Sequence, residues 1–203
     1  MKQILFLGDS ITDCGHSFDP RNLGYGYVKI ISQHLESEAS VINKGIDGFT
    51  LSSVKRMWNQ VKDHYSPDVI SILVGINDIY MMETTGMDIP FALEEFKISY
   101  KTLLESIRKS FHGPIILMEP FVFPQPMEYK NWFDSLTKMN QIIGNIAEQY
   151  NVTYIPLWNT LLDRASKLGY AELTTDGVHL TQEGHKILAD AWITAYKNTK
   201  NKV

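Results

Sequence analysis

The chain has 203 residues, of which 44% are hydrophobic and 21% charged, the size and composition of one globular domain with a substantial core. Its net charge of −4 gives no broad attraction to phosphate backbones, which argues against nucleic acid as a partner. No apolar run is long enough to cross a bilayer, and the one after Lys2 is too short for a secretory signal. We therefore predict a single domain over residues 1–203 that is cytoplasmic and has no membrane partner.

Apolar runs of strand type alternate with amphipathic segments along the chain. The predicted elements are a strand at 4–7, a helix at 28–35, a strand at 41–42, a helix at 51–65, a strand at 69–74, a helix at 90–111, a strand at 115–118, a helix ending near 150, a strand at 152–155, and helices at 157–168 and 181–196. The run at 69–74 is almost continuously apolar and β-branched, as expected for a central parallel strand buried on both faces.

This alternation predicts an α/β fold, a three-layer α/β/α sandwich around a mainly parallel sheet of five strands with right-handed crossovers. Such sheets often bind nucleotides through a Gly-x-Gly-x-x-Gly or a Gly-Lys-Ser/Thr loop, and the sequence contains neither motif. A different ligand is therefore expected at the sheet.

Chemically useful residues follow the first three predicted strands. Ser10 lies in Gly8-Asp9-Ser10 after the first strand, Gly48 follows the second, and Asn77 follows the third within a loop that starts at Gly75. Because ligands of open α/β sheets bind outside the carboxyl ends of the strands, these residues are expected to share one edge. Near the C-terminus, Asp176 lies three residues before His179, in a predicted loop that precedes the last helix.

Together these residues supply what acyl transfer requires. Ser10 is a candidate nucleophile, His179 a general base and Asp176 the carboxylate that fixes the tautomer of the base. The backbone N–H groups of Ser10 and Gly48 and the amide of Asn77 are candidate donors to an oxyanion. Each residue alone is more typical of a turn or a helix cap, but the complete set in this order favours a hydrolase.

The same blocks resemble a known family. Gly8-Asp9-Ser10, Gly48, Gly75-x-Asn77 and Asp176-x-x-His179 are similar, in order, to the four sequence blocks of the SGNH (GDSL-type) esterases and lipases, most of all to an intracellular bacterial branch with xylan acetylesterases. The resemblance covers nearly the whole chain. It implies a flavodoxin-like SGNH hydrolase fold, a catalytic set of Ser10, Asp176 and His179, and an oxyanion hole formed by Ser10, Gly48 and Asn77.

The sequence departs from the family pattern at three positions. Ile11 stands where the motif has Leu, and Leu180 follows the histidine where many relatives have Pro. Thr175 precedes the aspartate where the xylan esterases carry an aromatic residue. The change at Thr175 bears on the substrate rather than on the chemistry.

Two other functions are considered as alternatives to the esterase. Asp9, Asp13 and Asp78 are carboxylates in neighbouring loops, as a magnesium-dependent phosphohydrolase would need, but that reading leaves Ser10, Gly48 and His179 without a role. A binding protein that keeps the fold without turnover is the third hypothesis. The esterase hypothesis requires neither a metal nor an organic cofactor.

The sequence limits the substrate only to a small-molecule ester. The resemblance favours a short-chain, acetyl ester of a carbohydrate such as an acetylated oligosaccharide, with a lysophospholipid or an acyl thioester as the alternative, and it suggests a homo-oligomer. Residues 121–124 are candidate walls of an acyl pocket, and Met81-Met82 a candidate lid or subunit contact. The aromatic residues considered for stacking on a sugar ring are Tyr25, Tyr27, Tyr80, Trp132, Phe133 and Trp158.

Two further side chains are expected to have no catalytic role. The lone cysteine, Cys14, cannot form an internal disulfide, and we expect it to be packed rather than reactive. His185, in the last predicted helix, is expected to pack or to lie on the surface.

Overall fold

A computed structural model describes residues 1–200 of the chain; residues 201–203, the end of the predicted domain, lie outside the described part. Five strands form one parallel sheet, as the sequence predicted, and their order in the sheet is β2-β1-β3-β4-β5. The strands are β1 (Lys2–Gly8), β2 (Ala39–Gly45), β3 (Val69–Leu73), β4 (Ile115–Met118) and β5 (Thr153–Ile155).

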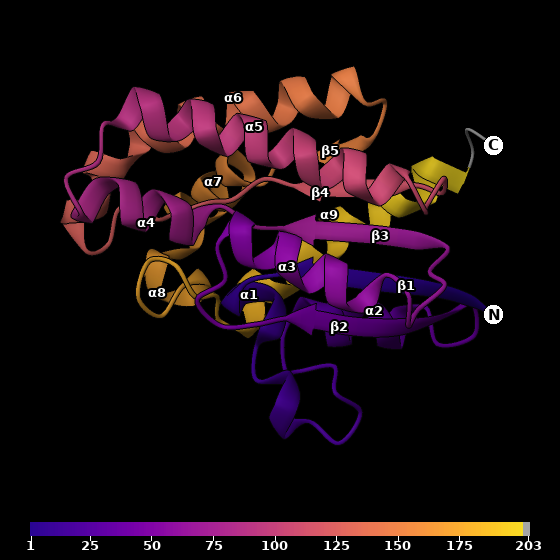
Figure 1. Cartoon of the computed structure of the whole chain (residues 1–203). Coiled ribbons are helices and arrows are strands. Elements are labelled where there is room, and N and C mark those ends of the chain that lie inside the picture. The colour runs from indigo at the N-terminus through magenta and orange to yellow at the C-terminus, as the bar shows by residue number, and fades with distance from the viewer. Residues whose placement is uncertain (201–203) are drawn as a thin grey trace.

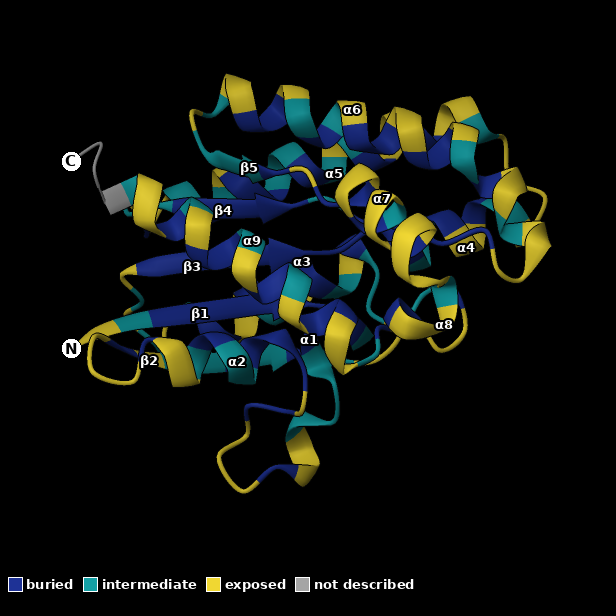
Figure 2. Ribbon diagram, turned by 180° about the vertical axis from the view of Figure 1, so that it is seen from behind, coloured by how far each residue is buried: buried dark blue, intermediate teal, exposed yellow. Residues whose placement is uncertain are grey.

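Helices cover both faces of this sheet (Figures 1 and 2). The helical segments are α1 (Ser10–Asp13), η1 (His16–Phe18), α2 (Tyr27–His34), α3 (Leu51–Val61), α4 (Ile76–Thr84), α5 (Ile89–Arg108), η2 (Met127–Trp132), α6 (Phe133–Gln149), α7 (Trp158–Leu168), α8 (Tyr170–Leu173) and α9 (Gln182–Lys200). Helices α2 and α9 pack together on the face seen in Figure 2, whereas α3 contacts α5 and α5 contacts α6 on the other. This arrangement is the three-layer α/β/α sandwich.

The strand order places the switch in winding direction between β1 and β3. From β1 the chain crosses to β2 on one side, and from β3 it crosses to β4 on the other. Ligands of doubly wound sheets bind at such a point, outside the carboxyl ends of the strands. In the register, Gly8 at the end of β1 is level with Gly45 of β2 and Leu73 of β3, so the segments carrying Ser10, Gly48 and Asn77 leave the sheet side by side.

Burial follows from the sequence pattern. The β1 residues from Ile4 to Leu7 and the β3 residues Ile70 and Ile72 have no exposed surface, as expected for central strands covered on both faces. Within residues 1–200, no helix combines the length and the apolar character needed to cross a membrane.

The stretch after β3 differs from the prediction. The sequence suggested a loop around Asn77, but residues 76–84 form α4, and Asn77 lies in its first turn. The helix was not predicted because its N-cap is Gly75, whose φ of 141° suits glycine and which has no side chain to cap the helix. Met81 and Met82 therefore lie on a helix, where Met82 is buried and Met81 is exposed.

Candidate active site

Ser10 is presented at the start of a short helix. A Cβ at Gly8 would come within 2.6 Å of the Leu73 carbonyl oxygen, so a glycine allows β1 to turn sharply into α1. Asp9 is the N-cap of α1, and its Oδ1 accepts a hydrogen bond from the Ile11 N–H at 3.1 Å. Ser10 is the first residue of α1, where a backbone N–H has no acceptor within the helix.

The loop before α9 holds Asp176 and His179 as one rigid unit. Oδ1 of Asp176 accepts the backbone N–H groups of Val178 at 2.9 Å and His179 at 2.7 Å. Gly177, the residue after Asp176, has a φ of 94°. Its carbonyl accepts the backbone N–H of Phe123, from the segment after β4, at 2.8 Å. The loop therefore presents the imidazole from a fixed backbone.

His179 joins the other two side chains. Its Nδ1 lies 2.6 Å from Oδ2 of Asp176, and its Nε2 lies 3.0 Å from Oγ of Ser10. With the Nδ1 proton donated to the carboxylate, Nε2 carries the lone pair that accepts the hydroxyl proton of Ser10. The structure thus brings together Ser10 and His179, two candidate site residues that are 169 positions apart in the sequence.

Asp176 is suited to remain ionised. Partial burial acts to raise its pKa, but hydrogen bonds from the His179 ring and from the backbone N–H groups of His179 and Val178 outweigh this and lower the pKa below its ordinary value. About half of each side chain is exposed, 50% for Asp176 and 48% for His179. The pair is therefore open to substrate and water.

Gly48 lies in the turn after β2 with a φ of 73°. An added Cβ would meet no atom within 4 Å, so the space next to Gly48 is open. The turn is held to β1 because the Ile46 N–H donates to the Gly8 carbonyl at 3.2 Å. Gly48 therefore faces free space beside the end of β1.

Asn77 contacts the same turn from α4. Its Nδ2 donates to the Phe49 carbonyl at 3.1 Å, which fixes the orientation of the amide. A primary amide carries two N–H donors, so one proton remains for a further acceptor. Asn77 is thus placed against the Gly48 turn, with a donor left over.

The three carboxylates of the metal hypothesis have separate partners. Asp9 bonds the Ile11 N–H, Asp13 bonds His16 and the Asp47 N–H, and Asp78 bonds the Leu51 N–H. In the part of the chain that the structure describes, no three His, Cys, Asp or Glu side chains are grouped as metal ligands would be. The geometry offers a magnesium phosphohydrolase no ligand set among these residues.

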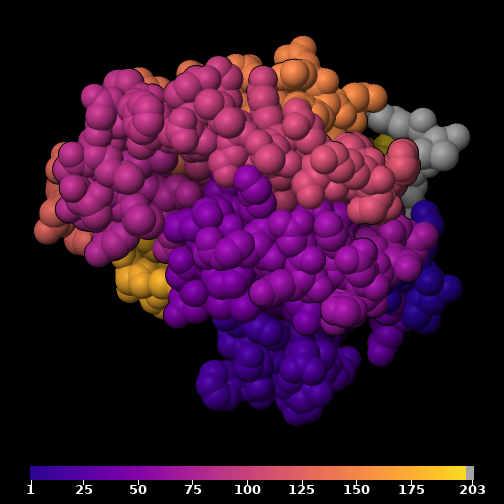
Figure 3. Space-filling model, in the orientation of Figure 1, coloured from indigo at the N-terminus to yellow at the C-terminus, as the bar shows by residue number. Residues whose placement is uncertain are grey.

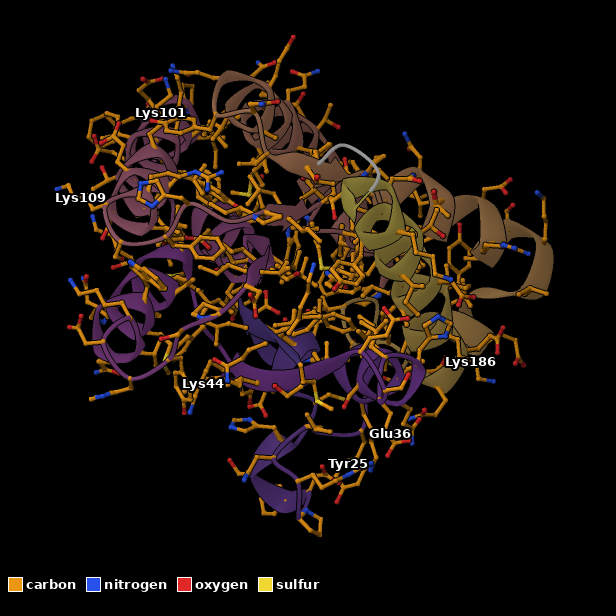
Figure 4. The ribbon with its side chains drawn as sticks, turned by 90° about the vertical axis from the view of Figure 1, so that its right-hand side faces the viewer. Tyr25, Glu36, Lys44, Lys101, Lys109 and Lys186 are labelled. Atoms are coloured by element: carbon orange, nitrogen blue, oxygen red, sulfur yellow. The ribbon has the colours of Figure 1, made fainter. Side chains whose placement is uncertain are left out.

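Three of the six candidate sugar-stacking aromatics belong to the core, and Phe133 is partly buried against it. Tyr27 has no exposed surface, and Trp132 and Trp158 expose only 7% and 8%, so these three pack instead of facing a ligand. Tyr80 is 54% exposed on α4. Tyr25 is exposed on a segment that projects from the body of the protein between α1 and α2 (Figures 1, 3 and 4).

Burial also bears on the predictions for residues 121–124 and for the pair His185 and Cys14. The side chains of Phe121, Val122 and Phe123 are 1% exposed or less and lie in the core. His185 is buried, accepts the Tyr27 N–H at 3.2 Å, and lies 3.4 Å from the Cys14 sulfur. Burial lowers the pKa of His185 to about 4 and raises that of Cys14. The contacts of His185 with Tyr27 and Cys14 show that it is packed against these residues.

A parallel α/β sheet that carries a hydrogen-bonded serine, histidine and aspartate at its carboxyl edge has the architecture of a serine hydrolase. The sequence profile of the GDSL-like lipase/acylhydrolase family matches residues 6–187. The chain therefore belongs to this family and is a carboxylic ester hydrolase, as its sequence blocks predicted.

Relatives extend over almost the whole chain. An acetylxylan esterase of Geobacillus stearothermophilus is 31% identical, over 95% of this chain and 92% of the relative. An isoamyl acetate-hydrolyzing esterase of Saccharomyces cerevisiae is 21% identical, over 93% of this chain and 83% of the relative. The crystal structure of a catalytic mutant of Axe2, an acetylxylan esterase from Geobacillus stearothermophilus, superposes with a TM-score of 0.83 at 28% identity, covering 96% of this chain and 93% of Axe2.

Proposed function

We propose that this protein is a serine esterase that removes short acyl groups, above all acetyl, from carbohydrate. The observation that carries the proposal is the position of His179, 3.0 Å from the Ser10 hydroxyl and 2.6 Å from the Asp176 carboxylate. This is the hydrogen-bond chain in which an imidazole removes a proton from a serine and is then stabilised by a carboxylate.

The reaction proceeds in two steps. His179 takes the proton of Ser10 as Oγ attacks the ester carbonyl carbon, and Asp176 stabilises the resulting imidazolium. The tetrahedral intermediate collapses, the leaving alcohol receives the proton from His179, and an acyl-serine remains. Water then attacks the acyl-serine with the same base, which releases the carboxylic acid and restores Ser10.

We assign the oxyanion hole to three donors from neighbouring strand ends: the backbone N–H groups of Ser10 and Gly48 and the amide of Asn77. The open space beside Gly48 and the unused proton of Asn77 support this assignment. Donors fixed in advance stabilise the developing negative charge without reorganising during the reaction.

The Axe2 structures support the catalytic roles. Mutants of Axe2 that are described as catalytic replace a serine, an aspartate and a histidine, with the aspartate three positions before the histidine. Asp176 and His179 have the same spacing. Neither a metal nor an organic cofactor enters the proposed steps.

Acetyl is the acyl group that the relatives have in common. One is named for acetylated xylan and the other for isoamyl acetate, two substrates with the same acid and unrelated alcohols. The site that would contact the alcohol differs from that of Axe2, because Axe2 has a tryptophan directly before its catalytic aspartate, whereas this chain has Thr175. We propose an acetylated carbohydrate as the substrate, with contacts at Thr175 that differ from those of Axe2.

A longer acyl chain, as in a lysophospholipid or an acyl thioester, is the second candidate. An apolar hollow of about 420 Å³ lies beside α4, next to the helix turn that carries Asn77. Its apolar lining includes Leu51, Met81, Met82, Phe91 and Phe96. A hollow of this size and lining favours a longer chain, and the rates on esters of increasing acyl length distinguish the two candidates.

Three further predictions from the sequence remain proposals: a single domain over residues 1–203, a cytoplasmic location and assembly into a homo-oligomer. The two related esterases, which this chain matches over most of their length, support the first of these.

The proposed function is tested by comparing wild type, Ser10→Ala and Ser166→Ala on p-nitrophenyl acetate, p-nitrophenyl octanoate and an acetylated xylo-oligosaccharide, with EDTA present. Ser166 is an exposed serine of α7 and serves as the matched control. We expect wild type and Ser166→Ala to prefer the acetyl esters and Ser10→Ala to be inactive. Activity that survives in Ser10→Ala contradicts the serine mechanism, and a preference for octanoate moves the assignment to the lipid-type candidate.

A further inference from the structure

The N-terminus of α3 is capped by a residue from another helix. Thr50, the N-cap of α3, makes no side-chain capping hydrogen bond. Asp78 of α4 supplies the acceptor instead, because its Oδ2 and Oδ1 lie 3.0 and 3.3 Å from the Leu51 nitrogen. A backbone donor that has no acceptor within its own helix is thus satisfied by a residue 27 positions away in sequence.

This bond lies directly behind the proposed oxyanion hole. Asn77, the residue before Asp78, donates to the Phe49 carbonyl at 3.1 Å. Two successive residues of α4 therefore hold the chain on both sides of Thr50, just after Gly48. Through these two bonds, the segment that carries the Gly48 N–H is tied to the helix that carries the Asn77 amide.

The other end of the Gly48 turn is hydrogen-bonded to the segment that carries the serine. The Ile46 N–H donates to the Gly8 carbonyl at 3.2 Å, and the Asp47 N–H donates to Oδ2 of Asp13, in α1, at 3.0 Å. The turn is thus held between α1 on one side and α4 on the other. Removing either attachment frees one oxyanion donor to move relative to the others.

We propose that Asp78 is a positioning residue of this active site, which sets the separation between the Gly48 N–H and the Asn77 amide by capping α3 from α4. The proposal rests on the esterase function and the oxyanion hole proposed above. Oxyanion donors must lie about 2.7–3.1 Å from the charged oxygen. A displacement of about 1 Å in an active site lowers the rate as much as ~100-fold, so one lost cap at this place affects catalysis more than a cap elsewhere.

The test compares three Asp78 variants with a cap at a different helix. Asp78→Ala removes the acceptor. Asp78→Leu removes it and introduces a larger, apolar side chain, for which the apolar hollow that Asp78 borders with Met81 and Met82 offers space. Asp78→Asn keeps an oxygen that accepts the Leu51 N–H. The control is Asp88→Ala, because Asp88 also accepts a backbone N–H at a helix N-terminus, that of Phe91 at 2.8 Å, but it does so as the local N-cap residue of α5.

We expect kcat on p-nitrophenyl acetate to fall about 10- to 100-fold in Asp78→Ala and Asp78→Leu, with KM within about twofold of wild type. Asp78→Asn should recover most of the rate. Asp88→Ala should have a lower unfolding temperature and wild-type kcat. A small alkylboronic acid, which forms a tetrahedral adduct with the serine, should bind Asp78→Leu more weakly by the same factor as the fall in kcat/KM.

A purely structural role of Asp78 predicts different results. In that case, kcat per folded molecule stays at the wild-type value in every folded Asp78 variant and the boronic acid binds normally, which overturns the proposal. If Asp78→Ala does not fold, Asp78→Leu gives the result. The two proposals fail separately: activity in Ser10→Ala contradicts the esterase mechanism, whereas an inactive Ser10→Ala beside a fully active Asp78→Leu contradicts only the positioning role.

Discussion

Asp176 and Asp9 are the two carboxyl groups nearest to the proposed catalytic serine in contacts and in sequence, and their environments differ. Asp176 is half exposed and its two oxygens receive two backbone N–H groups and the imidazole, which together lower its pKa. Asp9 is 1% exposed; its Oδ1 receives the Ile11 N–H, and its Oδ2 has no hydrogen-bond partner. Burial, together with the negative charge of Asp78, raises the pKa of Asp9 to about 7.

The difference shows which carboxyl group suits the chemistry. A carboxylate that stabilises an imidazolium must be ionised and must contact the imidazole, and only Asp176 meets both requirements. Asp9 is adjacent to the nucleophile in sequence, but its hydrogen bond is to the helix that presents Ser10. Proximity in sequence therefore identifies the capping residue, and the hydrogen bonds identify the catalytic partner.

The largest expected effect comes from exchanging each of these carboxyl groups for an amide. Asp176→Asn should lower kcat by about 10⁴-fold, because an amide N–H facing Nδ1 favours the wrong tautomer of His179. Asp9→Asn should stay within about tenfold of wild type, because asparagine caps a helix as well as aspartate does. The measurement is kcat on p-nitrophenyl acetate for both variants. A larger loss in Asp9→Asn would reverse the assignment of the two residues.

A smaller effect is expected from the oxyanion hole. Asn77→Ala should cost on the order of 3 kcal/mol of transition-state stabilisation, or about 100- to 1000-fold in kcat, because one donor is lost. Asn145→Ala, at an exposed position of α6, is the matched control and should retain the wild-type rate. If Asn77→Ala is as fast as wild type, Asn77 does not belong to the oxyanion hole.

Much of this arrangement was predictable from sequence, for a physical reason. Strands β1, β3 and β4 are largely apolar runs, β2 contains the short run Val41-Ile42, and in a parallel sheet the residues after such runs meet at one edge. The positions of Ser10, Gly48 and Asn77 could therefore be predicted without knowing the contacts. The spacing of Asp176 and His179 likewise allows a hydrogen bond within one loop.

The parts that could not be predicted depend on contacts between distant segments. Helix α4 starts at a glycine without a capping side chain, so its first turn reads as a loop. Asp78 seemed a candidate metal ligand because nothing in the sequence shows that it caps α3. Tyr27 and Trp158 likewise could not be assigned to the core, since an aromatic residue next to a predicted loop fits either environment.

The smallest expected effect is a change in the pH dependence of stability when Asp9 is replaced by asparagine. The pKa of Asp9 is 3.8 in an unfolded chain and about 7 in the folded protein, so the folded protein binds the proton more tightly. The contribution of Asp9 to the free energy of unfolding is therefore complete below pH 3.8 and is lost as the pH rises through about 7. Asp9→Asn does not titrate and lacks this loss. Between about pH 5 and about pH 8, wild type should therefore lose on the order of 2 kcal/mol more unfolding free energy than Asp9→Asn.

Urea unfolding of both proteins at the two pH values measures this difference. Burial also raises the pKa of Asp78 to about 7, but Asp78 is present in both proteins, so its direct contribution largely cancels in the comparison. Equal pH dependence in wild type and Asp9→Asn would mean that Asp9 is ionised in the folded protein at little cost. Asp9 and Asp176 would then both be ionised, and they would differ only in that Asp176 contacts the imidazole of His179 whereas Asp9 does not.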